Sequence, residues 1–549
     1  MEATRLLAWV DERSRKESGP LFLICLISTF VVGLIAHASR FFDASITYDS
    51  VFFDRADDAA WQVSLGRYLE PVYRMVLGDQ ITTPWLVGFL SLLYIAIMVF
   101  LIMQVLSLDK PIEAILIAAV IVTSQPIAIV FALFFPFADG QVFSMLLAVL
   151  AVWVLRRVRT GARLVIAGFA LGVSLAVYQA SIGTFVVLVM LVVARDILND
   201  VEPSRVAREV GVSVLAAVLA GVFYVVGMYI SLQIVDVPLY NGTNGPGSLR
   251  QFGLGAIPSL VAHAWWRPVS YFFIPGGYNG LLMVAFNCIL AVLAALSLIR
   301  IAARLHSVIR VTLASLAFVA APLGANLIYI ATKGETYELM ETSFVFFYIA
   351  VIMLTCLASR CDGDSETEKP RSAMRSSEGS RAAIRIGVVV PMALCSLLVA
   401  LISWNGIVTA QGLYFMRQLD YQGTVSSLTR IIDRIEQLDG YEYGETPIMV
   451  VGTYSASDSL AHQPDSFSRY SEYASARSMA AGAAIDHNIQ LAAYFDRVMD
   501  YEVDLHSYPA EADLVSDEGK AQIEEMKAFP AQDSCKMIDG VAVVKLSDV

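Results

Sequence analysis

The chain has 549 residues, of which 57% are hydrophobic and 16% charged, and its mean hydropathy is +0.63. Soluble domains contain ~45–50% apolar residues, so this composition excludes an ordinary soluble protein. The net charge of −12 argues against nucleic acid as a partner, because nucleic acids bind basic surfaces. The six cysteines show no metal-ligand spacing and no disulfide framework.

Long apolar runs predict a polytopic α-helical membrane protein, because a helix of about 20 apolar residues crosses ~30 Å of hydrocarbon. We expect about eleven spans, at 21–38, 84–107, 112–131, 141–155, 164–177, 182–194, 210–232, 281–299, 311–331, 343–359 and 386–404. Residues 1–20 are expected to form an amphipathic cytoplasmic N-terminus. The first run has no small-residue cleavage site and is expected to be retained as a span.

The short runs 164–177 and 182–194 are joined by Tyr178–Gly183. A single tilted helix over 164–194 is the alternative to two crossings. The flanking segments Arg156–Arg159 and Arg195–Arg208 are both basic, and short cytoplasmic loops are enriched in Lys and Arg. Two crossings keep both segments inside. The inner segments then hold 21 of the 38 Lys and Arg residues and the outer loops seven, with the N-terminus inside and the C-terminus outside.

This topology divides the chain into a transmembrane domain at 21–406 and an extracytoplasmic tail at 407–549. The transmembrane domain carries an acidic outer loop at 39–83, a long outer loop at 233–280 and a polar cytoplasmic linker at 360–385, which is expected to be disordered. The tail is predicted to be an α/β domain. Its expected elements are helices within Gln411–Leu438, Asp486–Met499 and Glu518–Lys527, and strands at Pro447–Gly452 and Val541–Leu546.

The first outer loop combines seven acids with arginines and aromatic residues. A solvated loop is the simplest interpretation, but the aromatic residues favour packing on the membrane surface, where carboxylates tend to be functional. Nucleotide sugars are absent from the outer face, so a transferase there needs a donor that already carries its leaving group, typically a lipid phosphate. Such a reaction needs a carboxylate to accept the proton of the attacking hydroxyl and cations to hold the departing phosphate. A divalent cation, Mg or Mn, could assist, but the acids alone do not establish one.

Several motifs in this region resemble the GtrII-type glucosyltransferase family. They are TYDS at 47–50, WQVSLGRYLEPVY at 61–73, TPWLVGFLSLLY at 83–94 and LGVSLAVYQASIG at 171–183. The resemblance implies a bacterial membrane glycosyltransferase of the C-type (GT-C) architecture. It also implies transfer of a sugar, commonly glucose, from a polyprenyl phosphate to a surface glycan such as O-antigen. The resemblance places the catalytic region in the first outer loop, at Asp49, Asp57 and Asp58.

One of these three aspartates is expected to be the general base, and the sequence does not distinguish among them. Arg67 is expected to bind the lipid phosphate, with a structural ion pair to Glu70 or Asp58 as the alternative. Asp139 is either an acid of the sugar site or the N-cap of the next helix.

Four more residues complete the predicted site. Tyr178 and Gln179 either line a donor groove, since broken helices at membrane depth usually line cavities, or mark plain packing of small residues. Trp265 and Trp266 either stack on sugars or belong to an interfacial aromatic belt.

Lys333 either contacts phosphate or faces water. Three rival functions remain open. They are a C-type transferase for another lipid-linked sugar, a transporter or flippase of lipid-linked glycans, and a receptor or scaffold whose tail binds a partner. Against the transporter stand the lack of an inverted repeat and of a clearly ionisable residue within a span.

Overall fold

The computed structural model describes residues 18–43, 45–46, 51, 59–78, 83–241, 254–276, 279–305, 307–334, 336–367, 378–452 and 488–548. They divide into two compact units. Unit 1 comprises Met1–Phe41, Asp54–Phe131 and Phe137–Ala410, and unit 2 comprises Phe42–Phe53, Ala132–Pro136 and Gln411–Val549.

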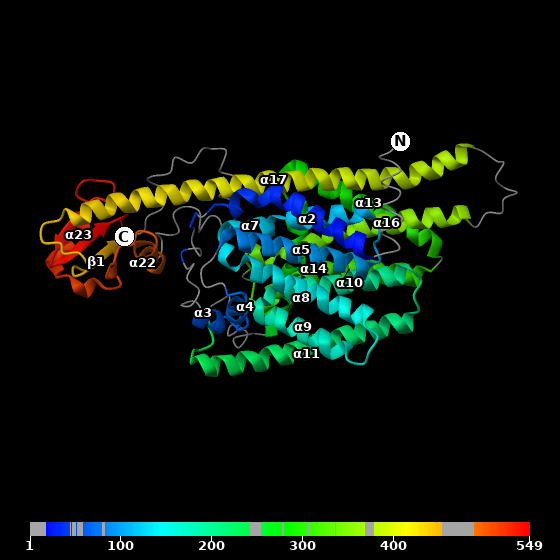
Figure 1. The fold of residues 1–549 in the computed structure, drawn as a ribbon, viewed down its shortest axis with the longest axis horizontal. Coiled ribbons are helices and arrows are strands. Elements are labelled where there is room, and N and C mark those ends of the chain that lie inside the picture. Colours follow the sequence, from blue (N-terminus) through cyan, green and yellow to red (C-terminus); the bar gives the residue numbers. More distant parts are fainter. Residues whose placement is uncertain are drawn as a thin grey trace. The chain divides into compact units, whose positions relative to one another are not determined.

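Unit 1 consists of helices that lie side by side, with α11 along one border (Figure 1). In chain order they are α2 (Ser18–Phe41), α3 (Ala59–Ser64), α4 (Glu70–Leu77), α5 (Pro84–Leu106), α6 (Pro111–Val122), α7 (Gln125–Leu133), α8 (Ala138–Arg157), α9 (Arg163–Val177), α10 (Ile182–Leu198), α11 (Pro203–Val235), α12 (Ile257–Phe273), α13 (Leu281–Leu305), α14 (Val308–Ala325), α15 (Leu327–Ala331) and α16 (Phe346–Thr367). Helix α17 (Glu378–Glu436) belongs to unit 1 up to Ala410.

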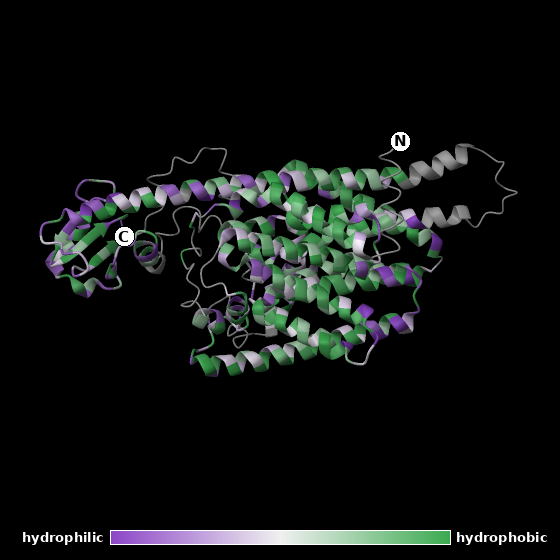
Figure 2. Cartoon of the chain, in the orientation of Figure 1, coloured by the Kyte–Doolittle hydropathy of each residue, from purple (hydrophilic) through white to green (hydrophobic). Residues whose placement is uncertain are grey.

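The helices have the length and composition of membrane spans. Within the described ranges nine helices are long and apolar enough to cross a membrane, or up to ten if the bent pair α6–α7 counts as one span. Figure 2 shows hydrophobic residues along the middle of the helices and hydrophilic residues toward their ends. A membrane protein is thus confirmed. The count is lower than the eleven expected, because α9 has only 15 residues and α6–α7 is bent by 44°.

The bend between α6 and α7 is accommodated by groups from other helices. The ring of His37, which is fully buried, lies with its Nε2 2.9 Å from the carbonyl oxygen of Val122 at the end of α6. A Cβ at Gly406 would overlap the carbonyl oxygen of Thr123, so only glycine allows α17 this close to the bend.

Helices α9 and α10 are separate, and the chain turns back between them. The short 3-10 helix η3 (Gln179–Ser181) lies between them, and Tyr178 has an extended backbone. At the far end of the two helices, Arg156 at the end of α8 donates to Asp196 near the end of α10. These residues could not meet if 164–194 were one straight helix, so the prediction of two helices is confirmed.

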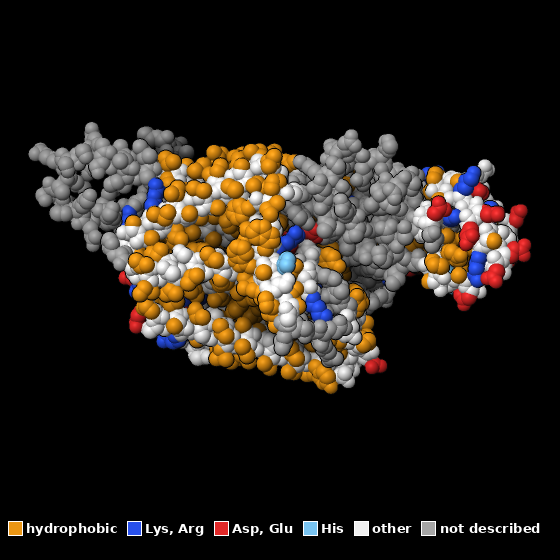
Figure 3. Space-filling view, turned by 180° about the vertical axis from the view of Figure 1, so that it is seen from behind, with side chains coloured by type: hydrophobic (Ala, Val, Ile, Leu, Met, Phe, Trp, Pro, Cys, Tyr) orange, Lys and Arg blue, Asp and Glu red, His pale blue; other side chains and the backbone are white. Residues whose placement is uncertain are grey.

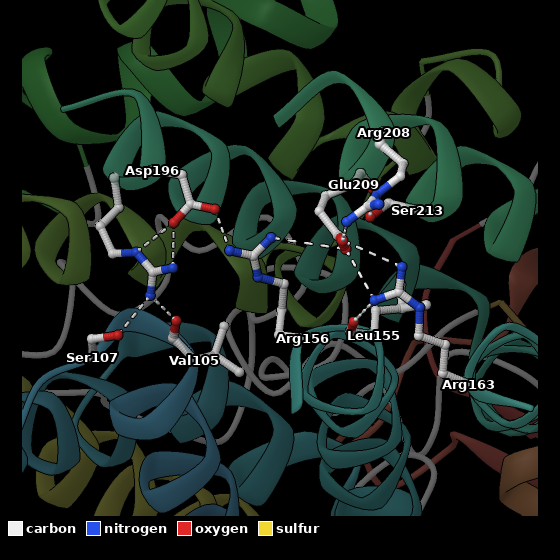
Figure 4. Close-up of polar contacts among 10 residues, drawn as sticks. Val105, Ser107, Leu155, Arg156, Arg163, Asp196, Arg208, Glu209 and Ser213 are labelled. Carbon is white, nitrogen blue, oxygen red and sulfur yellow. Dashed lines mark hydrogen bonds and ion pairs between the residues drawn. The ribbon is translucent and has the colours of Figure 1, made fainter. Parts of the chain in front are cut away.

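The contact between Arg156 and Asp196 belongs to a larger arginine network, drawn in Figure 4. Asp196 also pairs with Arg195, which in turn donates to the carbonyl oxygen of Val105 at the end of α5. Glu209 of α11 accepts from Arg163 at 3.2 Å and lies 3.8 Å from Arg208. The network ties together the ends of five helices.

We expect Asp196→Asn to lower the melting temperature of the purified protein strongly. The substitution leaves the Arg195 guanidinium, with 8% of its side chain exposed, without its anionic partner, and removing one partner of a buried pair is costly. Asp200→Asn is the matched control, because Asp200 is 73% exposed in its pair with Arg310 and exposed pairs contribute little. Equal melting temperatures of the two variants would contradict the structural role of the network.

Unit 2 contains a four-stranded sheet with helices on its two faces. Its strands are β1 (Ile448–Val451), β2 (Leu505–Tyr508), β3 (Cys535–Ile538) and β4 (Val541–Lys545), in the order β2-β1-β4-β3. Strand β1 pairs in parallel with β2 and β4, and β3 is antiparallel to β4. The C-terminal part of α17 and α22 (Asn488–Arg497) pack on one face, and α23 (Asp517–Glu525) packs on the other.

The sequence predicted part of this sheet. The strands expected at Pro447–Gly452 and Val541–Leu546 are β1 and β4, which are buried along their whole length. The helices expected at Asp486–Met499 and Glu518–Lys527 are α22 and α23. Strands β2 and β3 were not predicted, because their half-buried residues lack a continuous apolar run.

Candidate functional site

The short helix α4 packs across the ends of two long helices. Leu69, just before α4, donates its backbone N–H to the carbonyl oxygen of Ala176 in α9 at 3.0 Å. Tyr68 lies in an apolar cluster with Val63 and Ala176. Pro71 stands in the first turn of α4, where its lack of an N–H costs nothing, and Gly78 ends the helix in the left-handed conformation. The inward face of α4 therefore meets the start of α8 and the end of α9.

That face presents Tyr73 to a buried carboxylate. The Tyr73 hydroxyl donates to Asp139 Oδ2 at 2.9 Å, and the Tyr73 ring stacks on Phe143 with centroids 5.0 Å apart. Burial, and then the neighbouring charge of Asp139, raise the pKa of Tyr73, so its phenol stays protonated and acts as a donor. Asp139 is fully buried in the first turn of α8, where the helix dipole favours a negative charge.

One turn along α4, Arg74 pairs with Glu70. The side chains are 5% and 6% exposed, and the contact uses only Nε of the arginine. The guanidinium lies 4.8 Å from the centroid of the Phe137 ring. The two terminal amino groups of Arg74 are buried and have no hydrogen-bond partner among the residues that the structure describes. Leaving such donors unsatisfied is costly, so this arginine is equipped to bind a further anion.

Arg67 lies over the ring of Tyr178, with its guanidinium carbon 4.9 Å from the ring centroid. Its Nε and the buried hydroxyl of Tyr178 have no hydrogen-bond partner within the described ranges. Gln179 is held in place, because its amide donates to the carbonyl oxygen of Leu65 at 2.8 Å and to the hydroxyl of Tyr224 at 3.0 Å.

We call Arg67, Tyr73, Arg74, Asp139 and Tyr178 the α4 polar cluster. Asp139 begins α8 and Tyr178 follows α9, whereas Arg156 and Arg163 of the arginine network lie at the opposite ends of these two helices. The cluster combines two cations, a carboxylate and two hydroxyl groups, and three of its five residues belong to the acid-rich segment 39–83. Cations that are short of acceptors suit the binding of phosphate oxygens.

Asp49, Asp57 and Asp58, the predicted catalytic acids, lie outside the described residues. The structure contradicts part of one alternative from the sequence and the whole of another. Glu70 pairs with Arg74, and Arg67 stacks on Tyr178 instead of pairing with Glu70, whereas the other suggested partner, Asp58, lies outside the described residues. Asp139 is not an N-cap, because that position belongs to Phe137 and Asp139 accepts from Tyr73.

The remaining predicted residues lie on other elements. Trp265 and Trp266 stack on each other in α12, and the Trp265 indole donates to the carbonyl oxygen of Val319 in α14. Trp266 is 48% exposed. Lys333 follows α15 with a positive φ of 56°. Among the described residues, no hydrogen bond, ion pair or ring contact joins these three residues to the α4 polar cluster.

A second buried charge was missed by sequence reasoning. Arg267 of α12 donates from Nε to Glu341 Oε1 at 2.6 Å, and Glu341 is fully buried. Burial raises the pKa of Glu341 to about 7, although the Arg267 charge opposes this change. Its Oε2 has no hydrogen-bond partner among the described residues. No spacing in the sequence links residues 74 positions apart, whereas the i,i+4 spacing of Glu70 and Arg74 could have revealed their pair.

The divalent cation that could assist the reaction has no ligand set among the described residues. No group of three His, Cys, Asp or Glu residues in the described ranges is arranged to hold a metal ion. The acids proposed from the sequence as possible ligands are those of the 39–83 loop, and Asp49, Asp57 and Asp58 are outside these ranges.

Comparison with known proteins identifies the family. No curated protein and no solved structure matches the chain. The family model described as glucosyl transferase GtrII matches residues 39–357, which is more than half of the chain and includes every residue of the α4 polar cluster. On this match the chain belongs to the GtrII glucosyltransferase family.

Proposed function

We propose that this glucosyltransferase transfers glucose from a polyprenyl-phosphate donor to a cell-surface glycan, such as O-antigen, on the outer face of the bacterial cytoplasmic membrane. The N-terminus is then cytoplasmic and the C-terminal domain extracytoplasmic. The observation that carries the proposal is the α4 polar cluster, in which Arg67 and Arg74, both within the acid-rich segment 39–83, have buried N–H groups without acceptors among the described residues. Membership of the GtrII family supports the sugar.

The proposed chemistry is one displacement at the anomeric carbon. One of Asp49, Asp57 and Asp58 removes the proton of the acceptor hydroxyl, whose oxygen forms the new glycosidic bond. The bond from the anomeric carbon to the phosphate oxygen breaks, and the lipid phosphate leaves with that electron pair. The anomeric configuration is inverted relative to the donor.

The side chains of the bundle divide between donor and acceptor in this proposal. Arg67 and Arg74 hold the phosphate and stabilise the charge that develops on it. Tyr178 and Gln179 border the donor phosphate, with Lys333 as a further cation.

On the acceptor side, Asp139 orients Tyr73, and Trp265 and Trp266 offer flat faces for sugar rings. The C-terminal α/β domain is assigned to recognition of the acceptor glycan.

In the test, the purified protein is reconstituted in lipid vesicles. It is then given one polyprenyl-phosphate donor at a time, carrying labelled glucose, mannose, galactose or arabinose. Crude surface glycan from the host is the acceptor. We expect label from glucose to enter the glycan, and preference for another sugar would replace glucose in the proposal. Donor movement across the vesicle membrane without transfer of any sugar would instead establish a flippase.

A further inference from the structure

An apolar cavity of about 300 Å³ lies within unit 1, between α10, α12, α13, α14 and α16. Its walls include phenylalanines and alanines, such as Phe272, Phe318, Phe347, Ala291, Ala294 and Ala321. Ser343 is the one polar residue among those that line the cavity, and its hydroxyl donates to the carbonyl oxygen of Ala325 at 2.5 Å. Apart from this serine, the lining offers no polar side chain to a ligand.

The cavity is too large to be a packing defect. Protein interiors are close-packed, and voids larger than a water molecule are few. A volume of 300 Å³ reaches the lower limit of typical ligand pockets, which is roughly 300 Å³. The small alanine side chains on α13 and α14 maintain this space, since larger residues there would close it.

Two of the walls face lipid. Only 28% of the apolar window of α13 and 17% of that of α14 are buried inside the protein. The surface in Figure 3 is broadly apolar and is hollowed within that apolar area. Helices α13 and α14 therefore form the lipid-facing side of the cavity.

The lining of the cavity reaches the start of α10. A Cβ at Gly183 would overlap the carbonyl oxygen of Ala325 and lie 3.0 Å from Ser343 Oγ, and both Ala325 and Ser343 line the cavity. Gly183 lies in the first turn of α10, immediately after η3 and close in sequence to Tyr178, the residue on which Arg67 stacks.

Charge lies next to the lining in the sequence. Arg267 directly precedes the lining residue Pro268, Glu341 lies two residues before the lining residue Ser343, and Arg267 and Glu341 form the buried ion pair described above. These features fit a ligand that has an apolar chain and an anionic head group. The chain would lie among the phenylalanines of the cavity, and the head group would lie toward Arg67 and Arg267.

We propose that this cavity binds the isoprenoid chain of the donor, in the part nearest the phosphate. The inference rests on the proposed function for the identity of the lipid. The phosphate then lies toward Tyr178 and Arg67, and the distal chain extends between α13 and α14 into the bilayer. Bulk phospholipid is the competing occupant, and the experiment separates the two.

The test measures equilibrium binding of radiolabelled polyprenyl phosphate to the purified protein in detergent, which requires no sugar transfer. Ala294→Trp fills the cavity from α13 and should weaken binding about tenfold or more, because each CH₂ group expelled from an apolar site costs roughly a fourfold loss of affinity. Ala285→Trp, on an exposed position of the same helix, is the matched control and should bind like the wild type. Ala321→Phe fills the cavity from α14. It replaces Ala294→Trp in the binding test if Ala294→Trp lowers the melting temperature of the protein.

Wild-type affinity in both filled variants would overturn the proposal, as would displacement of the label by an equal concentration of phosphatidylglycerol. The outcome is separable from that of the proposed function. Wild-type protein that binds polyprenyl phosphate at this cavity yet transfers no glucose would contradict the function alone. Glucose transfer with unchanged binding in the filled variants would contradict only the cavity.

Discussion

Arg74→Met is expected to destabilise the protein and to abolish glucose transfer, and adding Glu70→Met should restore only the stability. The single substitution breaks the buried ion pair with Glu70, whose side chain is 6% exposed, and breaking a buried pair by removing one partner costs about 3–5 kcal/mol. Replacing both partners of a buried pair by apolar side chains removes both buried charges and is often close to neutral. Thermal unfolding of the three proteins in detergent measures this difference.

Glucose transfer should not recover in the double variant, even though its stability does. If the two unpartnered amino groups of Arg74 hold the donor phosphate, the double variant still lacks them. Loss of one such preorganised donor lowers kcat by about 10²–10³, and the double variant should remain that slow. Glu70→Met alone provides the control, because it keeps the arginine. A double variant that regained wild-type transfer together with wild-type stability would show that Arg74 serves only the fold.

The second large effect is expected at the predicted general base. Among Asp49→Asn, Asp57→Asn and Asp58→Asn, one variant should lose about 10²–10⁴ in kcat, the usual contribution of a positioned base. Its binding of polyprenyl phosphate should remain close to that of the wild type, since the asparagine keeps the shape of the side chain and loses only its basicity.

Asp43→Asn is the matched control for this series. Asp43 belongs to the same 39–83 segment, but its carboxylate accepts from the backbone and hydroxyl of Ser45 in a local turn. Its replacement should leave transfer unchanged. Three catalytically normal asparagine variants would remove the base from this loop and direct attention to Asp139.

The apolar helices were predictable because the requirement to cross hydrocarbon leaves a strong composition signal. Two separate helices, α9 and α10, were predictable although both are short, because basic segments flank the pair on both sides and short cytoplasmic loops are rich in Lys and Arg. The structure agrees, since Arg156 before α9 pairs with Asp196 near the end of α10. Strands β1 and β4 were predictable as continuous apolar runs. The edge strands β2 and β3 were not predictable, because their mixed polar and apolar residues resemble those of a loop.

The candidate site was less accessible to sequence reasoning. Arg67, Asp139 and Tyr178 were all named as candidate site residues, but the contacts of Arg67 with Tyr178 and of Asp139 with Tyr73 were not predicted, because they join residues far apart in the chain. The buried state of Arg74 and Glu341 depends on how α4 and α12 pack. An amphipathic segment of eight residues such as α4 does not reveal which face will be covered.

The most direct test of a lipid-phosphate-dependent glucosyltransferase is the stoichiometry of its two products. Wild-type protein in vesicles is supplied with polyprenyl-phosphate glucose labelled in both the sugar and the lipid, together with host glycan. The proposed displacement predicts one free polyprenyl phosphate released for each glucose that enters the glycan, with inverted anomeric configuration. Glucose incorporation without release of polyprenyl phosphate, or no incorporation by a protein that binds the donor normally, would contradict it.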